Sequence, residues 1–238
     1  MSDPSEQLAT LRALVDSATQ SLLGDTIGVP EEDWRAPSRL PNWTRGHVVS
    51  HLARQADALS NLVSWARTGE RTDMYASAEV READIEAGSA RSGLELQVDL
   101  DTSAERLEEG FASLDEADSW QSEVELRDGQ RVAARLLPLA RLSEVVLHHV
   151  DLGIGFGVDD IDAETAEWLL EWTSYRLGAR AEIPRLDLTA DSGFHTVIGS
   201  VGEVRTVRGP APLLLGWLTG RSAPDAVQGA DGLVLPGL

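Results

Sequence analysis

Apolar residues recur with a helical period through the first 150 residues of the chain. This pattern predicts helices that begin at Ser, Thr, Asp or Pro and are separated by glycine- or proline-containing breaks. The expected helices cover about residues 5–23, 44–68, 77–87, 94–114 and 138–152, with Gly24, Gly88 and Gly93 as breaks. Between the last two helices, residues 122–126 alternate and lead into Arg127-Asp128-Gly129-Gln130, which is typical of a hairpin turn.

The pattern changes after the last of these helices. Residues 153–162 are glycine-rich and read as a linker, and a further helix is expected over 163–180. Strand-like runs follow at 185–189, 195–198 and 204–207, and then a helix at about 211–219. The sequence therefore predicts an α+β protein, with a helical bundle over 1–152 and a small α+β domain over 163–238.

Composition limits the chemistry available to these 238 residues. The chain has 40 acidic and 20 basic side chains, a net charge of −20 and no cysteine, and every basic residue is arginine. Disulfides, iron–sulfur clusters, cysteine nucleophiles, Schiff-base lysines and Walker A loops are thereby excluded. The acidic balance disfavours nucleic acid as a partner. The polar start and the absence of a long uncharged stretch predict a cytoplasmic protein with no membrane partner.

The expected helix over 138–152 carries the first candidate chemistry. Its apolar residues cover a wide arc and leave a narrow stripe of Arg141, Glu144, His148 and Asp151. Glu144 and His148 are four residues apart, so they point the same way and can bind one ion. Asp151 can orient His148 or make a helix-end contact. The alternative is a solvent-facing stripe of salt bridges.

A third ligand is sought on the helix over 44–68. His51 lies at the edge of its apolar stripe, where a histidine either binds a metal or serves as a packed or capping residue. His47 and His51 form an HxxxH pair, but Val48 stands where a zinc peptidase needs glutamate. The glycines of 153–157 do not fit a dinucleotide-binding motif, and there is no GxSxG motif of a serine hydrolase.

Four segments, in order along nearly the whole chain, resemble the DinB-like helical bundles and, more narrowly, the mycothiol-dependent maleylpyruvate isomerases. They are Trp43 with 45–54 (RGHVVSHLAR), Met74-Tyr75-Ala76-Ser77 with Arg81 and 85–88, 144–153 (EVVLHHVDLG), and 215–221 (LGWLTGR).

The resemblance implies a zinc site of His51, Glu144 and His148, with mycothiol as the thiol cofactor. It implies isomerisation of maleylpyruvate, a small dicarboxylate, to fumarylpyruvate in gentisate breakdown, and a second domain similar to sterol carrier proteins. Arg221 matches the Gly-Arg end of the fourth segment, and we expect it to contact substrate or enolate. We also expect Asp151, Arg81 and Tyr75 to lie in the pocket.

Two other functions stay open at this point. A transferase would use the same metal and thiol but conjugate mycothiol to an electrophile and consume it. A non-catalytic protein would have no metal, or a structural one, and its second domain would bind an apolar ligand or a partner. Because the chain has no cysteine, any thiol in the reaction must come from outside.

Overall fold

The computed structural model of the chain describes residues 3–178 and 180–235. It divides into two compact units, Met1–Gly155 and Phe156–Leu238. The first unit is mainly helical and the second combines helices with a three-stranded sheet, so the predicted α+β fold class is confirmed. Within the described ranges, no helix is both long enough and apolar enough to cross a membrane.

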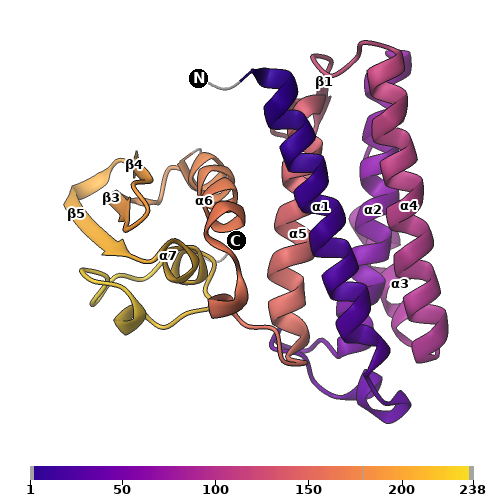
Figure 1. Cartoon of the computed structure of the whole chain (residues 1–238), viewed down its shortest axis with the longest axis horizontal. Coiled ribbons are helices and arrows are strands. Elements are labelled where there is room, and N and C mark those ends of the chain that lie inside the picture. Colours follow the sequence, from indigo (N-terminus) through magenta and orange to yellow (C-terminus); the bar gives the residue numbers. More distant parts are fainter. Residues whose placement is uncertain (1–2, 179, 236–238) are drawn as a thin grey trace. The chain divides into compact units, whose positions relative to one another are not determined.

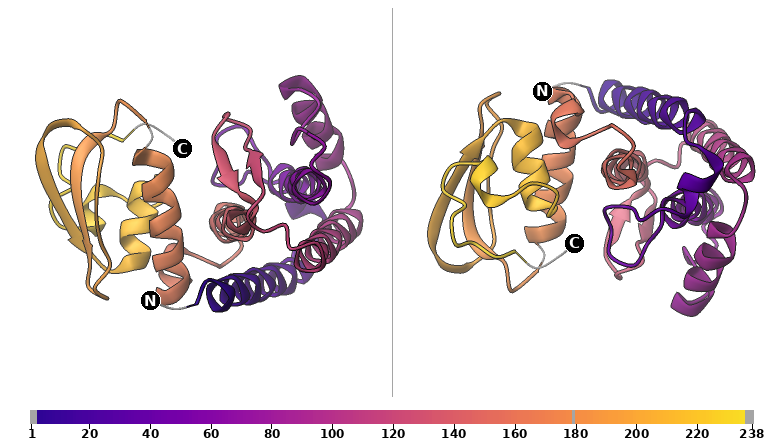
Figure 2. Two further views of the ribbon diagram at one scale, coloured as in Figure 1. Left: turned by 90° about the horizontal axis from the view of Figure 1, so that it is seen from above. Right: turned by 90° about the horizontal axis from the view of Figure 1, so that it is seen from below.

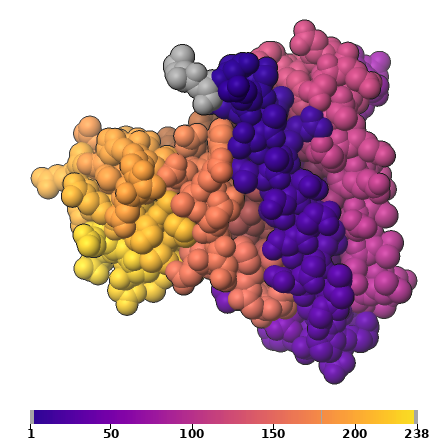
Figure 3. Space-filling view, in the orientation of Figure 1, coloured from indigo at the N-terminus to yellow at the C-terminus, as the bar shows by residue number. Residues whose placement is uncertain are grey.

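Four long helices build the first unit: α1 (Pro4–Ile27), α2 (Arg45–Thr68), α4 (Gly93–Glu116) and α5 (Leu137–Leu152) (Figure 1). Viewed along the helices, they are grouped around a common interior (Figure 2). α2 packs against both α4 and α5, and the shorter α3 (Ala78–Ser89) packs against α2. In the space-filling view, α1 lies across one face of the bundle with α4 beside it (Figure 3).

The bundle interior is apolar. Side chains from all four long helices meet in one cluster, including Leu22, Leu52, Leu100 and Val145, each with no exposed surface. Burying one such side chain stabilises the fold by about 1.5–3 kcal/mol. This apolar cluster therefore links all four long helices.

Both ends of α2 follow the sequence signals. Thr44 is the N-cap, and its Oγ1 accepts a hydrogen bond from the backbone N–H of His47. The ring of His47 closes the capping box, since its Nδ1 accepts from the backbone N–H of Thr44 at 3.2 Å. Gly69 ends the helix with φ at 76°. His47 is therefore a capping residue.

Contacts outside α5 fix its C-terminal end next to the start of α2. Gly153 ends α5 in the left-handed conformation, with φ at 64°. The Nε of Arg45, the first residue of α2, donates to the carbonyl of Leu152 at 3.0 Å, and the backbone N–H of Arg39 donates to the carbonyl of Asp151 at 2.7 Å. These bonds satisfy carbonyls that the helix leaves free and hold two ligand-bearing helices together.

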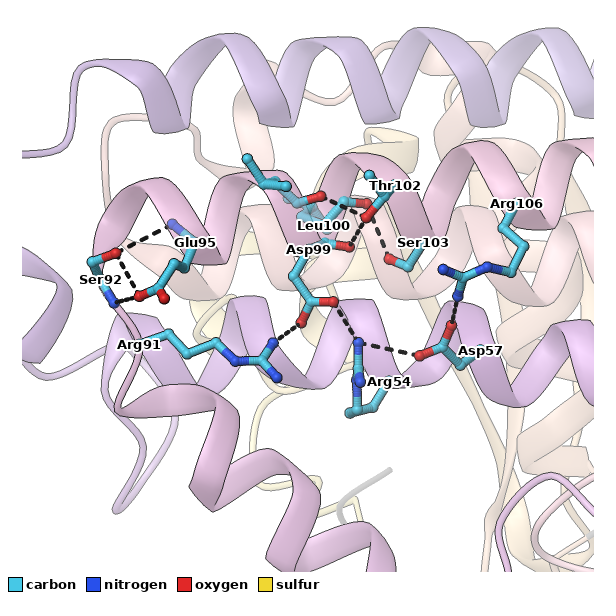
Figure 4. Close-up of polar contacts among 11 residues, drawn as sticks. Arg54, Asp57, Arg91, Ser92, Glu95, Asp99, Leu100, Thr102, Ser103 and Arg106 are labelled. Atoms are coloured by element: carbon cyan, nitrogen blue, oxygen red, sulfur yellow. Dashed lines mark hydrogen bonds and ion pairs between the residues drawn. The ribbon is translucent and has the colours of Figure 1, made fainter.

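An ion-pair network joins α2 to α4 (Figure 4). Arg54 Nη2 lies 2.6 Å from Asp99 Oδ1 and 3.1 Å from Asp57 Oδ2. Arg91 and Arg106 extend the network to the same two carboxylates. Between α4 and α5, β1 (Glu123–Glu125) and β2 (Arg131–Ala133) form the predicted antiparallel hairpin.

Two predicted glycine breaks are instead points of close packing. Gly88 lies inside α3, where a Cβ would come within 2.1 Å of Ser50 Oγ on α2. Gly93 is the first residue of α4, where a Cβ would come within 2.1 Å of Trp34 Nε1. The third break, Gly24, is also inside a helix, since α1 continues to Ile27; a single exposed glycine costs a helix only about 1 kcal/mol.

The second unit contains α6 (Ala163–Gly178), a three-stranded sheet and α7 (Ala211–Leu218). The sheet has the order β4-β3-β5, with β3 (Pro184–Ala190) antiparallel to β4 (His195–Ile198) and parallel to β5 (Val201–Gly209). α7 packs against α6 and the sheet. Residues 158–160 form a short 3-10 helix that packs against α7, so part of the stretch 153–162, predicted as a linker, belongs to this unit.

Candidate metal centre

The three predicted metal ligands come together inside the first unit. His51 extends from α2, while Glu144 and His148 extend from consecutive turns of α5. His51 Nε2 lies 2.9 Å from Glu144 Oε2, and His148 Nε2 lies 3.3 Å from the same oxygen. One ligand atom from each residue lies within 4.8 Å of the others, an arrangement that can hold a metal ion. His51 is buried, but the Glu144 side chain is 34% exposed, so solvent reaches the cluster.

Asp151 supports the cluster from behind His148. Its carboxylate is buried, and its Oδ2 accepts a hydrogen bond from His148 Nδ1 at 2.8 Å. Since an ionised carboxylate can only accept, Nδ1 carries a proton, which leaves Nε2 as the nitrogen that faces Glu144. A carboxylate that orients a histidine in this way is common behind metal ligands. His148 and Asp151 are three residues apart on α5, and this spacing brings their side chains into contact.

The charges of the three side chains follow from burial and hydrogen bonding. Burial lowers the pKa of His51 and outweighs its contact with Glu144, which keeps this imidazole neutral. Burial would raise the pKa of Glu144, but hydrogen bonds from His148 and His51 hold it well below its usual range. For His148, burial is outweighed by the hydrogen bonds to Asp151 and Glu144, so its pKa is raised. A neutral imidazole beside an ionised carboxylate is ready for a metal ion.

Aromatic and cationic side chains surround His51. Its ring lies 5.4 Å from the ring of Trp43 and 4.8 Å, edge-on, from the ring of His148. Arg81 on α3 places Nη2 3.3 Å from His51 Nδ1, and its guanidinium carbon lies 5.6 Å from the Tyr75 ring. Burial raises the pKa of Tyr75, so its phenol stays protonated. Arg81 and Tyr75 thus lie next to the cluster.

Arg141 is buried between the two helices that carry the ligands. Its Nη1 donates to the carbonyl of Leu52 at 2.8 Å and to Gln55 Oε1 at 2.7 Å, both on α2. Burial lowers the pKa of Arg141 to about 10, which leaves it charged at neutral pH. Arg141 stands one turn before Glu144 and joins α5 to the turn of α2 that follows His51.

Arg221 belongs to the second unit. It follows α7 beyond a left-handed turn at Gly220, where φ is 74°. Its backbone N–H donates to the carbonyl of Gly216 at 2.6 Å, and its Nη1 donates to the carbonyl of Thr219 at 2.9 Å. These bonds fix the side chain at the helix end, and its role toward a substrate stays a prediction.

Comparison with known proteins identifies the family. The family model for the mycothiol maleylpyruvate isomerase N-terminal domain matches residues 6–153, which include all three clustered ligands. The chain belongs to the mycothiol maleylpyruvate isomerase family.

Solved structures of the family extend the match over both units. The chain is similar to crystal structures of the mycothiol-dependent maleylpyruvate isomerase and of a histidine-to-alanine variant of that enzyme. In each case the identity is 27% and the TM-score is 0.86, over 100% of this chain and 99% of the other. No curated protein matches the chain. The resemblance found in the four segments is confirmed. The predicted enzyme class, an isomerase, is confirmed as well.

Two side chains near the cluster of this maleylpyruvate isomerase family member were not predicted to belong there. Trp43 belongs to the motif that continues at 45–54, and its ring also contacts His51. Gln55 accepts from Arg141 and lies one turn beyond His51 on α2. The available signal was their spacing: Gln55 follows His51 by four residues, and Trp43 immediately precedes the N-cap of the same helix.

Proposed function

We propose that the chain is a zinc-dependent cis–trans isomerase that converts maleylpyruvate to fumarylpyruvate, with mycothiol as the thiol cofactor, in gentisate breakdown. The observation that carries the proposal is the cluster of His51, Glu144 and His148 in a member of this family. Two imidazoles and a carboxylate are a common zinc donor set that leaves a coordination position open. The buried Asp151 behind His148 fits that use as well.

Several side chains have distinct parts in the proposed function. His51, Glu144 and His148 would hold the zinc, which supplies a Lewis acid able to deprotonate a bound thiol. Asp151 keeps the proton on His148 Nδ1 and the lone pair on Nε2. Arg141 holds Glu144 and His51 at a fixed spacing through its bonds to α2. Arg221, from the second unit, would contact a carboxylate or the enolate oxygen.

The chemistry explains why a thiol is needed. A cis double bond conjugated to a carbonyl group does not rotate freely. Addition of a thiolate converts it to a single bond, rotation follows, and elimination restores the trans alkene together with the thiolate. A free thiol has a pKa of about 8.5 and is mostly protonated at neutral pH, so a metal ion held by His51, Glu144 and His148 would supply the Lewis acid that favours the thiolate. Mycothiol is regenerated in each cycle.

The test follows maleylpyruvate absorbance with zinc-loaded protein, with and without mycothiol, while free thiol is measured in parallel. We expect conversion to the trans isomer only when mycothiol is present, with no loss of thiol. Stoichiometric loss of thiol would instead identify a transferase. His51→Ala is the matched control, and it should lose both zinc and turnover. If the purified and folded wild-type chain does not bind zinc, both the isomerase and the transferase function are ruled out.

A further inference from the structure

Arg81 contacts a histidine and an aromatic ring in this acidic chain. Acidic residues outnumber arginines by 40 to 20, and arginines such as Arg12, Arg54 and Arg106 contact carboxylates. Arg81 is partly buried on α3, and its contacts are His51 Nδ1 at 3.3 Å and the Tyr75 ring. In the portion of the chain that is described, no carboxylate lies within ion-pair distance of it.

The contact with His51 specifies one tautomer. A guanidinium has only N–H donors, so His51 Nδ1 must accept the hydrogen bond from Arg81. The remaining ring proton is then on Nε2, where it is donated to Glu144 Oε2 at 2.9 Å. In this state both nitrogens of His51 are engaged, one as acceptor and one as donor.

Metal binding at His51 is incompatible with this contact. If Nε2 binds the metal through its lone pair, the ring proton moves to Nδ1, which then faces the donor groups of Arg81 with a donor of its own. If Nδ1 binds the metal, the lone pair that accepts from Arg81 is used. In both cases the guanidinium loses its acceptor, and a metal cation next to it adds repulsion.

We propose that Arg81 blocks His51 in the metal-free protein and, once released by metal binding, binds a carboxylate group of the anionic substrate. This assignment rests on the proposed function for the substrate class. A guanidinium fork matches a carboxylate with two parallel hydrogen bonds, and the Tyr75 ring keeps the released side chain near the cluster. Arg81 would thus favour carboxylate substrates within a molecule whose net charge of −20 repels them.

The test needs no turnover and no thiol. Zinc affinity is measured by chelator competition, and maleate affinity by calorimetry on metal-free and zinc-loaded protein. We expect Arg81→Gln to tighten zinc binding about two- to tenfold, the equivalent of one lost hydrogen bond. In the zinc-loaded protein the same variant should bind maleate about ten- to a hundredfold more weakly. Arg81→Lys, which keeps the charge, should retain more of the maleate affinity than Arg81→Gln.

Arg71→Gln is the matched control, because it removes the same charge from an exposed arginine that pairs with Asp73 and Glu125. It should leave both affinities unchanged. Zinc affinity that stays the same or falls in Arg81→Gln would overturn the blocking role, and unchanged maleate affinity would overturn the carboxylate contact. The maleylpyruvate assay of the wild-type chain tests the isomerase function independently, so either proposal can fail alone.

Discussion

Glu144 shares one carboxylate oxygen between two imidazoles, so the cluster is already charge-paired without a metal ion. Glu144 has a depressed pKa, so its contribution to stability is present above about pH 4.5 and is lost as the pH falls through the folded value. His148 has a raised pKa, so its contribution is present below about pH 6.5 and is lost as the pH rises through the folded value. Between these limits both contributions act together.

A variant of His148 tests this pH window. In chelator-treated protein, His148→Gln should lower the free energy of unfolding more at about pH 5.5 than at about pH 8.5, because the protonated imidazole gains more from its carboxylate partners than the neutral ring does. Urea denaturation at both pH values measures the difference. His195→Gln, a change at an exposed histidine of the second unit, should have little effect at either pH. A loss of equal size at the two pH values would contradict the prediction.

The carboxylate behind His148 provides a second test at this scale. Asp151→Asn keeps an acceptor for His148 Nδ1 but removes the charge, so zinc binding should weaken about 10- to 100-fold. Chelator competition gives the affinity. Asp25→Asn is a matched control, because Asp25 Oδ2 lies 2.9 Å from Nε2 of the neighbouring His149, which is outside the cluster. If both variants bind zinc with the same affinity, Asp151 does not support the metal site.

At the scale of the elements, the geometry of the cluster depends on how α2 and α5 are held together. Arg141 donates from α5 to two groups on α2, and both are inside the bundle. Replacing it by methionine leaves the Leu52 carbonyl and the Gln55 amide without this donor. Each lost bond to a charged donor is worth about 1.5–3 kcal/mol, partly offset because methionine needs no desolvation of charge.

We therefore expect Arg141→Met to lower the free energy of unfolding by about 1–3 kcal/mol in urea denaturation. It should also weaken zinc binding, since the spacing of the two helices is less well fixed. Arg106→Met removes an arginine that is 60% exposed and pairs with Asp57, and it should change stability by less than about 1 kcal/mol. Equal effects of the two changes would show that Arg141 is not a structural link between the helices.

Sequence periodicity predicts which residues share one face of a helix, but it does not predict which helices pack against each other. It placed Glu144 and His148 on one face of α5, because i, i+4 spacing within a helix depends only on backbone geometry. It left His51 between two interpretations, since 93 residues separate it from Glu144 and only the packing of α2 on α5 brings them together. The resemblance supplied that pairing, and the structure places the side chains next to each other.

Arg141 illustrates what periodicity cannot resolve. It was assigned to the same polar stripe as Glu144 and His148, which is correct for its direction on the helix. The stripe itself does not show whether a position faces solvent or a neighbouring helix. Arg141 is 1% exposed because α2 offers it a backbone carbonyl and an amide oxygen. Both bonds are made by Nη1, and a buried charge held in this way depends on tertiary contacts.

At the scale of the whole molecule, the chemistry requires positive charge within a very acidic protein. The proposed substrate has two carboxylates, which a net charge of −20 repels, and the proposed enolate would add further negative charge. The first unit contributes the metal cluster with Arg81 beside it. In the proposed function the second unit would contribute Arg221, which its own contacts hold at the end of α7. We expect both units to be needed for turnover.

Arg221→Ala separates metal binding from catalysis. Because the three ligands all lie in the first unit, the variant should bind zinc with wild-type affinity, while turnover of maleylpyruvate should fall by about 10²-fold or more, as for removal of a charged group that stabilises an oxyanion. Metal content and initial rates with mycothiol measure the two effects. Arg208→Ala removes the same charge from an exposed position on β5 and should keep most of the activity. If Arg221→Ala turns over at the wild-type rate, Arg221 has no part in the mechanism, and Arg81 would be the next arginine to vary.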